Sequence, residues 1–150
     1  MSDEKIQQEA NILLQEYAVL QRYAEELSAY LNNISTALAE ASLARKSIEE
    51  LYKGEEKEVL LSLDRNGNAF IKAEIKDKNK IIVSIGGDYY LYTSIEKAMD
   101  ILDKKISEIE ESRKNLEKEL SSVLGRINQI KQQLAILQER LSKQGSQNKG

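Results

Sequence analysis

Two uncharged, apolar-rich runs contain the residues of this chain that are best suited to a binding role. Their side chains could bind apolar surface of another molecule non-covalently. The runs read ANILLQ at residues 10–15 and QQLAILQ at residues 132–138. Burial of apolar surface is worth about 25 cal/mol per Å² and requires no sequence match in the partner. The two runs therefore predict a surface that binds exposed apolar segments of other polypeptides.

The groups that carry most enzyme chemistry at neutral pH are missing from the sequence. The chain contains no His and no Cys, which removes the commonest general acid and base and the thiol nucleophile and metal ligand. Its acidic residues are spread along the predicted helices, so we expect no enzyme activity, no metal site and no cofactor. Gly86-Gly87-Asp88 lacks the spacing of a phosphate-binding loop and predicts a turn.

Two stretches of heptad repeats carry these runs. Apolar residues occupy every seventh position, which we call d, and most of the intervening a positions, the pattern of a coiled coil. The d residues are Ile6, Leu13, Leu20, Leu27, Ile34, Ala41 and Ile48 in the first stretch, and Ile95, Leu102, Ile109, Leu116, Val123, Ile130 and Leu137 in the second. Arg45 and Arg113 interrupt the a positions, and we expect each to reach solvent or a nearby Glu.

The equal lengths of the two stretches predict one antiparallel pair of long helices, at about 4–53 and 94–142, with a disordered polar tail at 143–150. This pairing brings the two uncharged runs together near the chain ends. Low charge there would let the helix ends separate and expose part of the seam. We predict a binding surface made of Ile12, Leu13, Leu14, Leu134, Ile136 and Leu137. Two alternatives remain open: scattered surface hydrophobes, which are normal in soluble proteins, or contacts with neighbouring arms.

Between the helices the apolar period changes to two, which predicts two β-hairpins at about 57–92. Asn66-Gly67 lies between two alternating runs and predicts a type I′ turn, because both residues tolerate a positive φ. The second hairpin is expected to turn at Gly86-Gly87-Asp88. Thr93 and Glu96 follow it and predict a capping box at the start of the second helix.

The predicted hairpins are too small to bury a core of their own, and their edges are unpaired. They could fold back on their own helices or pair with hairpins of other subunits. We favour the second arrangement, because two helices offer little surface for so many apolar side chains. The residues expected to mediate assembly are Val59, Leu61, Leu63, Ile71, Ile81, Val83 and Ile85, and Tyr89, Tyr90 and Tyr92 are expected in the core of the resulting sheet or barrel.

Composition fits a helical protein of one folding unit. The 150 residues are 41% hydrophobic, 31% charged and only 5% aromatic, which suits a coiled coil better than a packed globule. The charged start, MSDEK, does not resemble a signal peptide, and no stretch is long and apolar enough for a membrane span. The net charge of −3 and the balanced charges of the second helix argue against nucleic-acid and membrane partners. We expect a cytoplasmic protein.

The order helix, two hairpins, helix resembles the α-type subunits of the archaeal prefoldin family. The segments that carry the resemblance are EEKEVLLSL at 55–63, KAEIKD at 72–77 and IIVSIGGDYY at 81–90. It covers the chain except for the tail after about 142, and the two hairpins distinguish α-type subunits from β-type subunits, which have one.

The resemblance implies a mainly α fold with a small β part, in which the hairpins join an intersubunit β-barrel. It also implies an ATP-independent holdase of two α-type and four single-hairpin β-type subunits. Such a complex grips unfolded proteins near its coiled-coil tips and delivers them to a group II chaperonin. The alternative function is a structural coiled-coil adaptor or tether that binds one folded partner.

Overall fold

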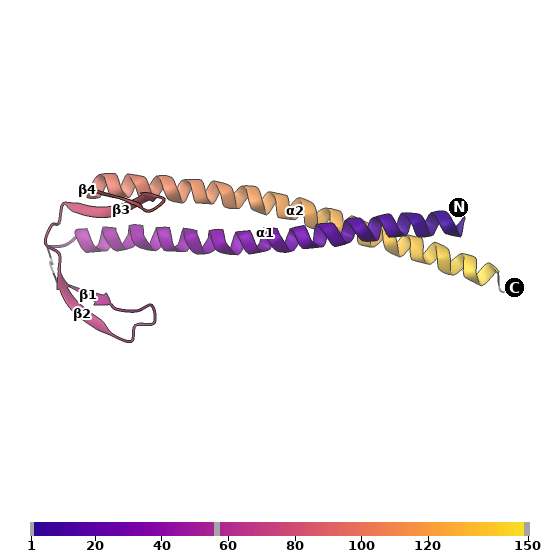
Figure 1. Cartoon of the computed structure of the whole chain (residues 1–150), viewed down its shortest axis with the longest axis horizontal. Coiled ribbons are helices and arrows are strands. Elements are labelled where there is room, and N and C mark those ends of the chain that lie inside the picture. Colours follow the sequence, from indigo (N-terminus) through magenta and orange to yellow (C-terminus); the bar gives the residue numbers. More distant parts are fainter. Residues whose placement is uncertain (1, 56–57, 149–150) are drawn as a thin grey trace. The chain divides into compact units, whose positions relative to one another are not determined.

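The chain folds into two long helices with two β-hairpins between them (Figure 1). The computed structural model describes residues 2–55 and 58–148. The elements in chain order are α1 (Asp3–Tyr52), β1 (Glu58–Ser62), β2 (Phe70–Glu74), β3 (Lys80–Gly86), β4 (Tyr89–Ser94) and α2 (Ile95–Gln147). β1 pairs with β2 and β3 pairs with β4, both antiparallel. The predicted fold class is confirmed at the level of the single chain.

The carboxyl end of α2 differs from the prediction. The helix continues to Gln147, past the expected end near 142, and the amide of Asn148 donates to the carbonyl of Gln144 at 3.2 Å. Helix therefore occupies residues 143–147, where we expected disorder. The polar side chains there do not interrupt the backbone ladder, and the chain contains no Pro to end it. Residues 149 and 150 of the predicted tail, and residue 57 of the predicted hairpin segment, lie outside the described residues.

The amino end of α2 begins one residue later than the predicted cap. The hydroxyl of Ser94, not that of Thr93, accepts the amide of Lys97 at 3.2 Å. Thr93 pairs with Ile81 in β4, and Ser94, the last residue of that strand, directly precedes the first helical residue, Ile95. The predicted capping box of Thr93 and Glu96 is therefore wrong, and Ser94 is the N-cap.

The chain divides into two compact units. In the first, residues 2–35 of the amino-terminal part pack against residues 112–148, with the two helix segments antiparallel. Two core clusters hold this unit together, and all of their buried residues are a or d positions of the predicted seam: Ile6, Leu13, Ile130 and Leu137 in one, and Ala24, Leu27, Val123 and Ile127 in the other. The heptad prediction is therefore confirmed in this unit.

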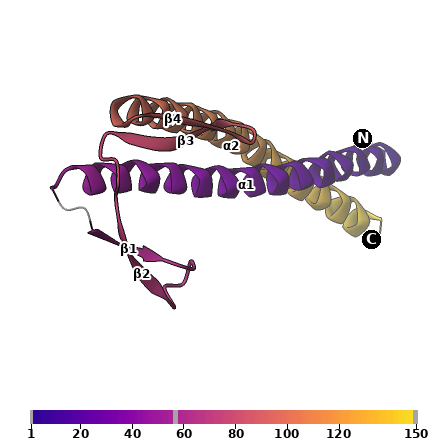
Figure 2. The same ribbon diagram turned by 60° about the vertical axis from the view of Figure 1, so that its left-hand side comes forward.

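In the second unit, which spans residues 36–111, the β3–β4 hairpin folds against the helices of its own chain. Val83 of β3 is 7% exposed and packs with Ile48, Ala98 and Leu102, and Figures 1 and 2 both show β3 and β4 alongside α2. The inner face of this hairpin therefore folds back on the helices of its own chain, which is the alternative that we did not favour. This face covers a seam that the helices alone would leave partly open to water.

A β-bulge changes the end of β3. The ladder shifts register between Ser84 and Gly86, so Ile85 leaves the face that Val83 occupies and is exposed. The predicted alternation through Ile85 is therefore wrong at this residue. Gly86 and Gly87 then adopt φ values of 111° and 58°, which confirms the predicted glycine turn.

The turn of the β1–β2 hairpin is not of type I′. Gly67 has a φ of 72°, but Asn66 has no positive φ, so a longer loop joins Ser62 to Phe70. The carboxylate of Asp64 organises this loop by accepting the backbone amide of Asn68 at 2.8 Å and its side-chain amide at 2.5 Å. These bonds, that of the Asn68 side chain first, hold the pKa of Asp64 below its ordinary value. Sequence pattern alone missed this side-chain interaction.

Gly125 offers a direct test of the packing of α2. A Cβ built on this residue meets nothing within 4 Å, and Gly in a helix interior costs about 1 kcal/mol relative to Ala. We expect Gly125→Ala to raise the free energy of unfolding by about that amount in urea titrations followed by circular dichroism. A loss of stability would contradict the packing described here.

Candidate functional site

The six residues predicted to bind apolar segments fall into two groups. Three lie outside the seam with half or more of their surface exposed: Ile12 at 65%, Leu14 at 51% and Ile136 at 50%. The other three belong to the seam. Leu13 and Leu137 are buried in one core cluster, and Leu134 packs half-buried against it. Only the first group is accessible to a partner in this structure.

The helix ends of the first unit stay together. Ile6 lies closer to the chain end than Leu13 does, yet it is only 1% exposed. A shallow depression over Ile6 is bordered by Arg140, Lys143 and Gln144 of α2. The separation that would expose Leu13 is therefore absent from this structure, and the apolar seam is closed up to its last d residue.

Polar contacts show which side chains share a side of the seam. With the heptads lettered from the d residues given above, Glu16 and Arg126 are both g positions. Arg126 donates to both carboxylate oxygens of Glu16, at 2.7 and 2.8 Å. The hydroxyl of Tyr23 likewise donates to Glu119, another pair of g positions. In a heptad, c adjoins g and b adjoins e. Positions c and g of both helix segments thus form one side of this unit, the g side, and positions b and e form the other, the e side.

This geometry brings together only two of the three exposed residues. Ile12 and Ile136 are both c positions, and each directly precedes a buried d residue of the same core cluster, Leu13 or Leu137. They therefore lie on the g side at the same level. Leu14 is an e position and lies on the opposite side of the seam. The prediction treated the three as one patch, which the heptad letters could already have separated.

Three exposed residues that we did not single out continue the g side along α1. They are Val19, a c position, and Tyr23 and Tyr30, both g positions. Their spacing follows that of Ile12 at intervals of seven, four and seven, so they line one face of the helix. We call Ile12, Val19, Tyr23, Tyr30 and Ile136 the g-side stripe. The sequence feature that could have identified this stripe is the presence of apolar and aromatic residues at c and g positions.

The e side has a different character. An open groove there is lined by a, b, e and f positions that include Tyr17, Ala24, Leu124 and Ile127. The ammonium of Lys131 lies 5.9 Å from the centre of the Tyr17 ring, within cation–π range. A cation therefore already covers the aromatic ring on this side.

The ion pair on the g side makes stability depend on pH. The hydrogen bond from Arg126 holds the pKa of Glu16 below its ordinary value of 4.5. Glu16 therefore stabilises the fold above pH 4.5, and this contribution is lost as the pH falls through the lowered pKa. We expect Glu16→Gln to remove part of the acid-dependent loss of unfolding free energy measured in urea between pH 5 and pH 3.

The two seam arginines meet acidic residues, as expected. Arg45 donates from Nε to Asp103, a residue of the opposite helix, and lies 3.6 Å from Glu49. Arg113 lies 3.7 Å from Glu117 of its own helix, and its buried Nε has no hydrogen-bond partner. These contacts explain how the seam accommodates two cations, with no need for a binding role.

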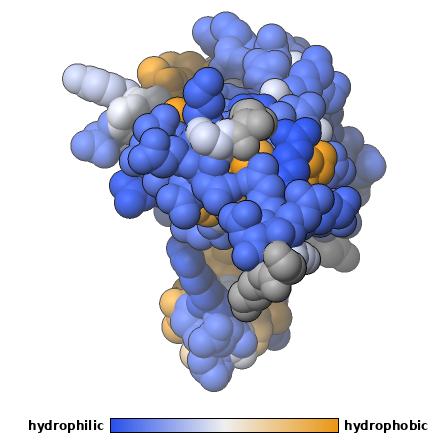
Figure 3. Space-filling model, turned by 90° about the vertical axis from the view of Figure 1, so that its right-hand side faces the viewer, coloured by the Kyte–Doolittle hydropathy of each residue, from blue (hydrophilic) through white to orange (hydrophobic). Residues whose placement is uncertain are grey.

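The β1–β2 hairpin exposes the apolar face on which assembly was predicted to depend. Leu61 and Ile71 pair across the hairpin, as do Val59 and Ala73, and their side chains lie on the same face. Leu61, Leu63 and Ile71 are all exposed. Figure 3 shows apolar surface, in orange, on this hairpin at the bottom of the view. Leu60 and Phe70 are also exposed, on the other face, where sequence reasoning did not look.

The β3–β4 hairpin divides its side chains between two environments. Val83 and the half-buried Ile81 face the helices. Ile82, Tyr90 and Tyr92 occupy the opposite face and are exposed. Of the residues expected in an intersubunit core, the inward pair is thus already packed within the chain, and the tyrosines are available to another subunit.

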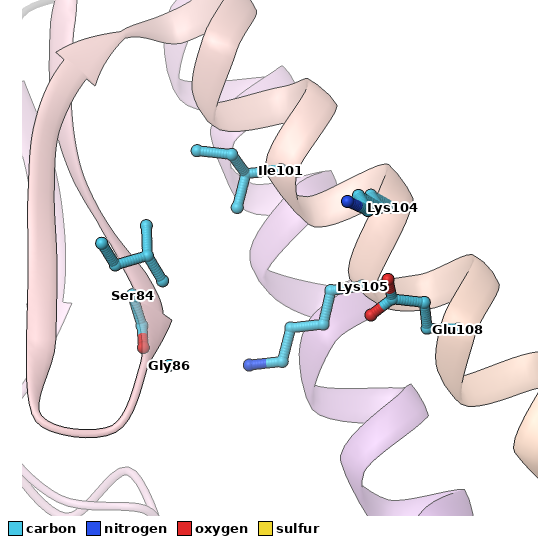
Figure 4. A pocket seen from close by; sticks show the side chains of 7 residues that line it. Ser84, Gly86, Ile101, Lys104, Lys105 and Glu108 are labelled. Carbon is cyan, nitrogen blue, oxygen red and sulfur yellow. The ribbon is translucent and has the colours of Figure 1, made fainter.

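A pocket between this hairpin and α2 has no evident chemistry. In Figure 4, Ile101 and Lys105 extend from α2 toward the strand that contains Ser84 and Gly86. No cluster of three or more acidic residues in the described ranges is placed to hold a metal ion. None of the helices within those ranges is long and apolar enough to cross a membrane.

Comparisons with known proteins agree with this architecture. A family model described as Prefoldin subunit matches residues 20–140. A Pyrococcus horikoshii protein named prefoldin subunit alpha is 32% identical over 130 residues, covering 87% of this chain and 88% of that protein. The protein of the same name from Sulfurisphaera tokodaii is 29% identical over 154 residues, covering 100% and 99%. In a cryo-electron microscopy structure of filamentous PFD from Methanocaldococcus jannaschii, one chain is similar in fold, with a TM-score of 0.62 and 20% identity over 80% of this chain and 96% of that one.

Proposed function

Since this chain belongs to the prefoldin family of chaperone subunits, we propose that it holds unfolded proteins without ATP and delivers them to a group II chaperonin. The observation that carries the proposal is that Ile12 and Ile136 are exposed at one level of the coiled coil. They lie beside the seam, which is closed at that level. Side chains that do not stabilise the coiled coil, and yet are apolar and accessible, can bury apolar surface of a client. A cytoplasmic location follows from this role.

The proposal includes assembly with single-hairpin β-type subunits through a shared β-barrel, in a complex of two α-type and four β-type chains. The support is the apolar face of the β1–β2 hairpin around Leu61 and Ile71, which lacks a cover within the described part of the chain. The outer face of the β3–β4 hairpin, with Ile82, Tyr90 and Tyr92, is a second surface for the same purpose. Exposed strand edges and apolar faces of this size favour pairing with other chains.

We expect replacement of Ile12, Leu14 and Ile136 by Ser to weaken client holding while leaving assembly intact. These residues lie outside the seam, so their loss removes apolar binding surface without opening the core. The measurement is light scattering of a chemically denatured protein diluted, without ATP, into the assembled complex. Wild-type complex should suppress aggregation, and the triple variant should need several times more complex for the same suppression.

Leu43→Ser provides a matched control, because Leu43 is an equally exposed leucine of α1 in the other unit. It should suppress aggregation as well as the wild type. Unchanged suppression by the triple variant would contradict the proposed site. Saturable binding to one folded protein, with none to denatured proteins, would indicate the structural adaptor instead.

A further inference from the structure

The g-side stripe is longer than the tip at which client binding was expected. It extends along α1 from Ile12 to Tyr30, and its members are exposed at 37 to 68% of their surface. Eighteen residues of helix span about 27 Å at 1.5 Å per residue. An extended polypeptide covers that distance with about eight residues at 3.3 Å each. The stripe therefore has the length of a short unfolded segment.

The middle of the stripe is acidic. Glu119 accepts a hydrogen bond from the hydroxyl of Tyr23, and Glu26, a c position, lies on the same side between Tyr23 and Tyr30. The hydrogen bond to Glu119 and the nearby charge of Glu26 both raise the pKa of Tyr23. The nearest g-side cation, Arg126, is already paired with Glu16. Two carboxylates thus stand beside two exposed aromatic rings.

Carboxylates next to tyrosine rings form a favourable site for an ammonium or guanidinium group, which gains both charge attraction and a cation–π contact. We propose that the g-side stripe, rather than the whole tip, docks the client, and that it selects apolar segments that carry Lys or Arg. The apolar side chains of the segment lie on Ile12, Val19 and Ile136, and its cation lies at Tyr23 and Tyr30 beside Glu26. This inference rests on the proposed function and specifies which client segments it recognises.

The e side is unsuited to the same segments. Its exposed Leu124 lines a groove in which Lys131 already lies over the ring of Tyr17, and Glu25 lines the same groove. A basic client residue would meet the ammonium of Lys131 as well as the carboxylate of Glu25 there, so it gains less charge attraction than beside Glu26 and Glu119. We therefore expect a basic client to prefer the g side to the e side, which makes the proposal testable within a single molecule.

The test is fluorescence anisotropy of labelled nine-residue peptides with the purified full-length chain. One peptide combines Leu and Val with two Lys, a second has Glu in place of Lys, and a third has Ser in place of Leu and Val. We expect the Lys peptide to bind about tenfold more tightly than the Glu peptide, and the Ser peptide to bind least. Equal binding of the Lys and Glu peptides would overturn the charge preference.

Matched variants assign the binding to one side. Val19→Ser with Tyr30→Ser should weaken binding of the Lys peptide about tenfold, and Glu26→Lys should reverse the preference between Lys and Glu peptides. Leu124→Ser, on the e side, should leave both affinities unchanged. Circular dichroism checks that each variant remains helical. A photo-crosslinking Lys peptide, which needs no variant, should label residues between 12 and 30 on the g side.

The outcomes separate the two proposals. If the wild-type complex suppresses aggregation but stripe and e-side variants lose peptide binding equally, the one-sided stripe is wrong and the holdase stands. If crosslinks map to the e side, the stripe is likewise wrong. If the wild-type complex does not suppress aggregation at all, the proposed function fails.

Discussion

Replacing Leu61 and Ile71 together by Glu is expected to abolish assembly of the chain with its partner subunits. The two residues face each other across the β1–β2 hairpin and are 48% and 47% exposed in the single chain. Two carboxylates on this face would have to lose their hydration in any shared β core, which costs several kcal/mol per charge. Light scattering coupled to size exclusion should show the free chain where the wild type forms a complex.

The helices should be unaffected by this double substitution, because the β1–β2 hairpin contributes no residue to the buried core clusters. Circular dichroism should therefore show an unchanged helical signal. Arg65→Glu, in the loop of the same hairpin, is the control and should assemble normally. A double variant that assembles with the wild-type mass would rule out this face as an intersubunit surface.

Ile130→Ala is expected to have the largest effect on stability. Ile130 is 0% exposed and belongs to the core cluster of Ile6, Leu13 and Leu137. Truncation of a buried Ile to Ala costs about 2 to 5 kcal/mol, a large share of the stability of a domain. Urea unfolding should show this loss. Ile136→Ala, on the same helix but half exposed, should change the unfolding free energy by less than about 1 kcal/mol.

The Ile130 and Ile136 variants together distinguish an effect on stability from an effect on client binding. Under the proposed function, Ile130→Ala lowers stability, and Ile136→Ala lowers client holding with the fold intact. Similar losses of stability in both variants would show that Ile136 belongs to the core and is not available to clients.

The seam could be predicted from sequence because its signal is long and regular. Repeats of seven residues fix which side chains are buried, and in the first unit every core residue falls on a predicted a or d position. Errors arose where one local interaction decides the outcome. The side chain of Asp64 builds a loop that replaces the predicted type I′ turn, and a bulge at Ile85 breaks a regular alternation.

The candidate site was predicted in part for a related reason. Side chains outside the a and d positions are expected to be exposed, so Ile12, Leu14 and Ile136 were correctly expected at the surface. Which of them share a side depends on how the two helices face each other, and the contacts of Arg126 with Glu16 provide that information. The packing of the β3–β4 hairpin places Val83 in one buried cluster with Ala98, a small residue of α2. A periodic pattern of apolar residues in the sequence does not indicate this packing.

The most direct test of this account is to mix the purified chain with the single-hairpin subunit proposed as its partner, measure the mass of the product, and add a chemically denatured protein without ATP. The account predicts a hexamer of two copies of this chain and four of the partner that keeps the denatured protein soluble. A chain that remains free of its partner, or a hexamer in which the denatured protein aggregates as fast as in buffer, would contradict it.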